Sequence, residues 1–72
     1  MSAATLQARL LAAHESGDTA QLVTLYSEAA ARVEDADAAG FYLTHAYVFA
    51  LEIGHPAAPA LHAQLKAQGR ES

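Results

Sequence analysis

The chain has 72 residues, which suffices for one small domain whose core is marginal unless its elements pack closely. Its net charge is −4 and it has only four Lys and Arg, so it lacks the cationic surface that binds nucleic acid or acidic membranes. Cysteine is absent, which excludes disulfides and thiolate metal sites.

Neither a targeting signal nor a membrane span is evident from the residue pattern. The N-terminal residues do not combine a basic segment with an apolar run, as a secretory signal does. The most apolar stretch, residues 38–53, is shorter than the roughly 20 residues that span a bilayer. We therefore expect a cytoplasmic protein with no membrane contact.

A first helix is predicted over residues 3–16. Leu6 and Leu10 lie on one face at helical spacing, and Ser2 is the expected N-cap. Gly17 is expected to end the helix, because glycine readily takes the left-handed conformation that follows a helix C-terminus.

The second helix shows the clearest amphipathic pattern of the sequence. Asp18 is expected to begin it, and Gln21 three residues later completes the pattern of a capping box. Its apolar residues follow at steps of three and four, as one buried face of a helix requires. These residues are Leu22, Leu25, Tyr26, Ala29 and Val33.

A third helix is predicted over residues 37–53, with Asp35 or Asp37 as its N-cap. This helix is apolar nearly all round, so its large apolar side chains cannot share one face. They are Phe41, Tyr42, Leu43, Tyr47, Val48, Phe49, Leu51 and Ile53. Such a helix is either central in a bundle or partly buried against another chain.

The fourth helix follows a turn at Gly54. Pro56 is expected at its first position and Pro59 within its first turn, where a missing N–H group costs nothing. Leu61 and Leu65 give this helix a narrow apolar stripe.

The whole chain is therefore predicted to be a single all-α domain of about four short helices. We expect two antiparallel helical hairpins, over residues 3–34 and 37–68. The two halves have identical residues at several positions when aligned at an offset of 37, which fits two hairpins stacked side by side. The aligned pairs are Ala13 with Ala50, Glu15 with Glu52, Gly17 with Gly54, and Ala20 with Ala57.

Gly17 and Asp18, followed by Tyr26 and Ala29, resemble the inter-helix turn and second helix of a tetratricopeptide repeat. The resemblance is clearest over residues 3–35, with a degenerate second copy from about residue 40. It implies tetratricopeptide-like hairpins, the other expectation for the fold being a small bundle. It also implies binding of peptides or proteins in a concave groove, as known members of that family do.

The histidines are the side chains expected to change charge near neutral pH. Glu52 and His55 have the Glu-x-x-His spacing of carboxylate-bridged di-iron bundles, but Gly54 is expected to end the helix between them. His62 and His55 flank the start of the fourth helix, where two histidines without a carboxylate make a poor metal site. We therefore expect turn and surface roles for these residues, and no bound metal or cofactor.

His45 lies within the apolar third helix and has two interpretations. It is either a buried pH switch or pocket residue, or a histidine of the core or of an interface that is hydrogen-bonded to a carbonyl, Tyr or Thr. We favour the second interpretation.

No catalytic site is predicted, because no nucleophile sits on a glycine-flanked elbow and the glycines are too scattered to cradle a phosphate. The leading prediction is a non-enzymatic module for protein–protein interaction or self-association, with a partner protein or a second copy of the chain. The expected interaction surface comprises Phe41, Tyr42, His45, Tyr47 and Phe49.

Two other functions are considered. The alternative is a small ligand- or metal-binding helical bundle that uses His45, Glu52 and the tyrosines. A more remote possibility is an accessory subunit of an enzyme that contributes no chemistry of its own. A binding bundle requires a polar-lined cavity, whereas an interaction module requires an exposed apolar patch.

Overall fold

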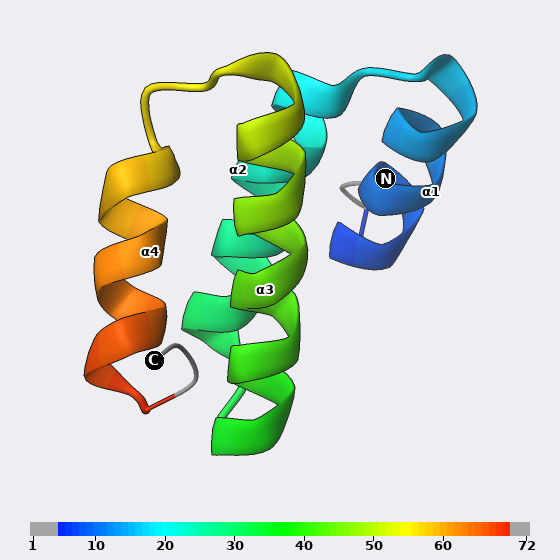
Figure 1. The fold of residues 1–72 in the computed structure, drawn as a ribbon. Helices are drawn as coiled ribbons and strands as arrows, with labels where there is room; N and C mark the ends of the chain where they lie inside the picture. The colour runs from blue at the N-terminus through cyan, green and yellow to red at the C-terminus, as the bar shows by residue number, and fades with distance from the viewer. Residues whose placement is uncertain (1–4, 70–72) are drawn as a thin grey trace.

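The computed structural model describes residues 5–69, and this part of the chain consists of four α-helices with no strand (Figure 1). The all-α fold class is therefore confirmed. The helices are α1 (Leu6–Ser16), α2 (Thr19–Arg32), α3 (Ala36–Ile53) and α4 (Ala58–Ala67). Short connections make each helix antiparallel to the one before it, as Figure 1 shows.

The helices pack in chain order, α1 against α2, α2 against α3, and α3 against α4. The contact between α2 and α3 is the most extensive, and α1 and α4 lie on opposite flanks of this pair (Figure 1). The result is a flat molecule with principal extents of 42 × 28 × 14 Å. A flat row of helices leaves broad faces of each helix open to solvent.

Three side chains cap the helix N-termini as hydrogen-bond acceptors. Thr5 Oγ1 accepts from the backbone N–H of Ala8 at 3.1 Å, so α1 begins at Leu6, later than expected. The expected cap, Ser2, lies outside the described residues. Asp18 accepts from the N–H of Gln21 at 3.1 Å, and Asp35, rather than Asp37, caps α3 by accepting from the N–H of Ala38 at 2.8 Å.

The turns after α1 and α3 have the same geometry. Gly17 and Gly54 both adopt the left-handed conformation, with φ of 71° and 62°. The following N–H group donates to a carbonyl five residues earlier in each turn, from Asp18 to Ala13 at 3.0 Å and from His55 to Ala50 at 2.8 Å. The offset of 37 residues noted in the sequence therefore relates two turns of one type.

The start of α4 differs from the prediction. Pro56 lies in the preceding turn and is not the first helical residue, since α4 begins at Ala58 with Pro59 in its first turn. Ala57 occupies the N-cap position, and its N–H group donates to Nδ1 of His55 at 3.0 Å. His55 thus orders the turn by accepting, through its side chain, the N–H group of the residue that follows Pro56.

The hydrophobic core consists of two clusters on either side of α2. The cluster of α2, α3 and α4 comprises Val23, Leu43, Ala46, Ala50, Leu61 and Leu65. The cluster of α1 and α2 comprises Ala13, Leu22 and Leu25. Tyr26 and Phe49 pack against both clusters, so aromatic rings connect the two parts of the core.

Candidate functional site

Tyr26 is the centre of an aromatic cluster that links three helices. It projects from α2 and its ring lies between residues of α1 and α3. Its ring centroid is 5.2–6.1 Å from those of four other rings, which belong to His14, Tyr42, His45 and Phe49. Centroid distances in this range are those of favourable stacked and edge-to-face pairs.

The hydroxyl of Tyr26 connects this cluster to α1. Its oxygen lies 2.9 Å from Nε2 of His14, at hydrogen-bond distance, and the His14 ring also meets Phe49 edge to face at 6.0 Å. The expected surface did not include His14 or Tyr26. One feature of the sequence pointed to Tyr26: among the apolar residues of the stripe on the second predicted helix, it alone has a side-chain hydroxyl group.

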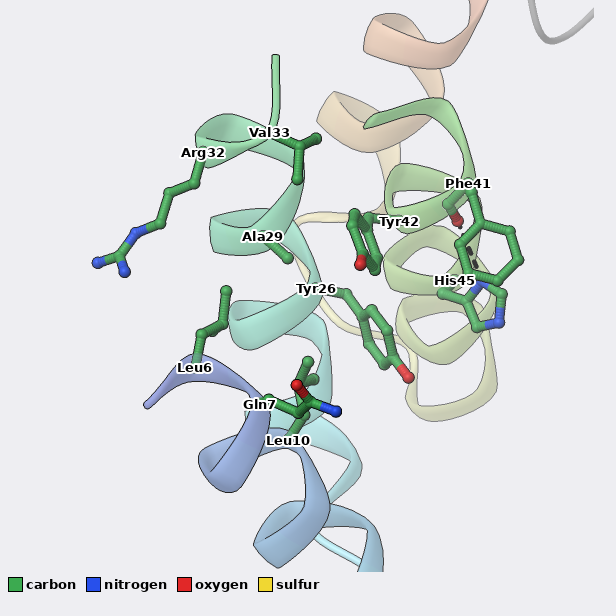
Figure 2. Close-up of a pocket in the computed structure, with 10 residues that line it drawn as sticks. All are labelled: Leu6, Gln7, Leu10, Tyr26, Ala29, Arg32, Val33, Phe41, Tyr42 and His45. Carbon is green, nitrogen blue, oxygen red and sulfur yellow. Dashed lines mark hydrogen bonds between the residues drawn. The ribbon is translucent and has the colours of Figure 1, made fainter. Parts of the chain in front are cut away.

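His45 is held against the surface of α3 by its own helix. Its Nδ1 donates to the carbonyl oxygen of Phe41 at 3.0 Å, as the dashed line in Figure 2 shows. Its ring is 4.3 Å from the Phe41 ring and 5.2 Å from the Tyr26 ring. The bond to a carbonyl is part of the favoured interpretation, whereas the place of His45 in the lining of a groove belongs to the other one, that of a pocket residue. The Nε2 atom has no hydrogen-bond partner among residues 5–69.

A groove of about 440 Å³ lies beside this cluster, with α2 at its base and α1 and α3 as its walls (Figure 2). Its lining is mainly apolar and aromatic, with polar groups from Gln7, Arg32 and His45. The complete lining is Leu6, Gln7, Leu10, Tyr26, Ala29, Arg32, Val33, Phe41, Tyr42 and His45. Such a surface favours apolar side chains with a few polar contacts.

Glu28 connects two arginines, one from α1 and one from α2. Its carboxylate forms an ion pair with Arg9 of α1 at 2.9 Å and with Arg32 at 3.7 Å. The Arg32 side chain is nevertheless 63% exposed, and its guanidinium points away from Tyr26 and His45 (Figure 2). Pairs that remain partly open to solvent, as these do, stabilise the fold by at most about 1 kcal/mol each.

A second feature is a row of exposed residues along the outer face of α3, here called the α3 stripe. It comprises Phe41, Thr44, Val48 and Leu51, which follow one another at steps of three, four and three residues. Phe41 is 58% exposed, Val48 46% and Leu51 56%. Thr44 is also exposed, and its hydroxyl donates to the carbonyl of Gly40 at 2.8 Å.

The five residues of the expected interaction surface do not lie together. Phe41, Tyr42 and His45 line the groove, and Phe41 belongs to the α3 stripe as well. Tyr47 lies on the other side of α3, where its ring stacks on His62 of α4 at 5.4 Å. Phe49 packs between the two core clusters. The expected surface is thus divided into three groove residues and two packing residues.

The residues considered for metal binding are separated by the end of α3. Glu52 is in the last turn of the helix, whereas His55 lies beyond Gly54 with its ring bonded to the N–H of Ala57. Between residues 5 and 69, no three His, Cys, Asp or Glu side chains gather closely enough to hold a metal ion. Over the same residues, the helices are too short or too polar to cross a membrane.

Comparisons with protein-family models, with curated proteins and with solved structures give no match to this chain.

Proposed function

We propose that this chain is a non-enzymatic helical module that binds protein through the outer face of α3, with either a partner protein or a second copy of itself. The exposure of the α3 stripe supports this proposal. Of the large apolar side chains that remain exposed in residues 5–69, Phe41, Val48 and Leu51 line up on one helix face. Clustered exposed apolar residues are typical of interaction surfaces, whereas isolated ones are ordinary.

The groove supports the same function because it adjoins the α3 stripe. Phe41 belongs to both, so a protein that covers the stripe can place a side chain in the groove. Aromatic residues such as Tyr26 and Tyr42 supply contact area at a low entropic cost, and their hydroxyl groups tolerate water at the edge of an interface.

The proposal includes two finer expectations from the sequence. The matching turns at Gly17 and Gly54 support tetratricopeptide-like hairpins. The location of the module is proposed to be the cytoplasm.

Site-specific photocrosslinking in the native host tests the interaction directly. A benzophenone amino acid replaces Val48 on the α3 stripe, and in a control chain it replaces the exposed Gln64 of α4. We expect a discrete protein adduct from position 48 and none from position 64, with mass spectrometry identifying the adduct as self or partner. No adduct at position 48, or equal labelling at both positions, contradicts the proposal.

A further inference from the structure

We propose that α1 is a detachable helix, which leaves α2 as a unit by pivoting at Gly17 while α2, α3 and α4 stay folded. This inference goes beyond the proposed function, which uses the outer face of α3, because α1 packs against α2 and not against α3. The docked α1 covers an apolar face of α2 and forms one wall of the groove. Its detachment uncovers that face and removes that wall, so α1 acts as a gate.

The hydrophobic core is divided in a way that makes α1 separable. The larger cluster, formed by α2, α3 and α4, contains no buried residue of α1. The smaller cluster has three buried residues, of which α1 supplies Ala13. Loss of α1 therefore leaves the buried residues of the larger cluster in place, and parts of a protein that are packed separately can open separately.

The helix α1 is held more weakly than α4, the helix on the opposite flank (Figure 1). Within α1, Ala13 is buried, whereas Leu6 and Leu10 are only partly buried. In α4, by contrast, Leu61 and Leu65 are both buried. A leucine side chain removes far more apolar surface from water than the methyl group of alanine, so docking of α1 is stabilised by less burial.

The polar contacts that fasten α1 are partly open to solvent. Arg9 pairs with Glu28 of α2 at 2.9 Å, and their side chains are 36% and 29% exposed. His14 Nε2 lies 2.9 Å from the hydroxyl of Tyr26, and the His14 ring meets Phe49 of α3 edge to face. Water replaces such contacts readily, so they position α1 on α2 but add little to the stability of docking.

The turn between α1 and α2 is suited to act as the pivot. It consists of Gly17 and Asp18, and Gly17 has a φ of 71°. Apart from its chain neighbours, no residue of the described part of the chain has an atom within 4 Å of the place that a Cβ at position 17 would take. Glycine changes its backbone conformation with few steric limits. Asp18 caps α2 by accepting the N–H of Gln21, so α2 keeps its N-cap when α1 leaves.

Detachment changes two surfaces at once. Leu22 and Leu25 of α2, which are 4% and 0% exposed in the docked state, lose the helix that covers them. Their burial favours docking, so the detached state is the minor one. The groove loses Leu6, Gln7 and Leu10, its wall on the α1 side (Figure 2). The groove therefore exists only while α1 is docked.

Hydrogen exchange on the unmodified chain, resolved by residue with NMR, measures detachment. An isolated helix of 11 residues is marginal in water, so α1 loses its amide protection when it leaves α2. We expect protection factors at the centre of α1 about a hundredfold below those of α2 and α3, and about tenfold below those of α4. Equal protection in α1 and α2, or in α1 and α4, overturns the proposal.

Thiol labelling tests whether α1 leaves as a unit, because the chain has no cysteine of its own. Ala13→Cys places a thiol between α1 and α2, and the control Ala46→Cys places one in the α2–α3 contact; the two alanines are 4% and 0% exposed. We expect the thiol at position 13 to react about a hundredfold faster than the one at position 46. Equal rates show that global unfolding exposes both thiols and overturn the proposal.

A third thiol, from Leu22→Cys, reports on the face of α2 that α1 covers. It should react at least as fast as the thiol at position 13, because the same event uncovers both positions and the smaller side chain holds α1 less firmly. A much slower reaction at position 22 shows that α1 frays without leaving α2, which contradicts a gate. Circular dichroism checks that all three variants remain helical.

Matched arginine variants test the contact that fastens α1. Arg9 and Arg32 both pair with Glu28, but only the pair with Arg9 joins two helices. In the Ala13→Cys chain, Arg9→Gln should raise the labelling rate about threefold, whereas Arg32→Gln should leave it unchanged. Neither substitution should alter the rate in the Ala46→Cys chain. Equal effects of the two substitutions at position 13, or an equal increase at position 46, contradict detachment of α1.

Discussion

At the scale of single residues, Tyr26 does more than fill the core. Its ring contacts His14 of α1 and Phe49 of α3. It therefore joins α1 and α3, which pack against α2 and not against each other. Its position in an amphipathic stripe predicted burial, which the structure shows to be partial. The aromatic neighbours could not be predicted, because their approach depends on how three helices meet and not on the pattern within any one of them.

Substitutions of Tyr26 should separate its ring from its hydroxyl. Tyr26→Phe removes only the hydrogen bond to His14, so we expect a loss of about 0.5 kcal/mol in the free energy of unfolding. Tyr26→Ala also removes the ring contacts and should cost about 3 kcal/mol. Urea denaturation followed by circular dichroism measures both values. Similar losses for the two variants would show that the hydroxyl, and not the ring, connects the helices.

At the scale of the helices, the termini were the most predictable part of the chain. Asp18, Asp35 and the two turn glycines act through hydrogen bonds to residues within five positions, so local sequence is sufficient to indicate them. The start of α4 was misplaced because His55 accepts the N–H of Ala57 in the turn, which shifts the first helical residue beyond Pro56.

Removal of the α3 cap should destabilise the protein measurably. Asp35→Ala takes away the acceptor of the Ala38 N–H group, and we expect the free energy of unfolding to fall by about 1 kcal/mol. Glu34→Ala is the matched control, because it removes an adjacent exposed carboxylate that does not cap the helix. Thermal unfolding at neutral pH measures the difference, and equal effects of the two variants contradict a capping role.

At the scale of the whole molecule, the flat arrangement explains why the third predicted helix is apolar on all sides. One face of α3 packs against α2, a second contacts α4, and the α3 stripe remains exposed. The sequence predicted this excess of apolar residues, but it did not predict which of them stay exposed. Phe49 and Tyr47 are drawn into packing by Tyr26 and His62, contacts between segments far apart in the chain.

The close approach of α2 and α3 should be the point at which the whole fold is most sensitive to added volume. Ala46 and Ala50 are fully buried in the cluster that includes Val23 of α2, so the small side chains permit the most extensive helix contact in the molecule. Ala46→Leu must force these helices apart, which typically costs about 2 kcal/mol. For a domain of this size we expect the melting temperature to fall by about 10 °C.

The control Ala60→Leu, at an exposed position of α4, adds the same volume with the same helix propensity and should change the melting temperature little. An equal decrease in both variants contradicts a tight junction, whereas a decrease confined to Ala46→Leu shows that the α2–α3 contact holds the two hairpins together.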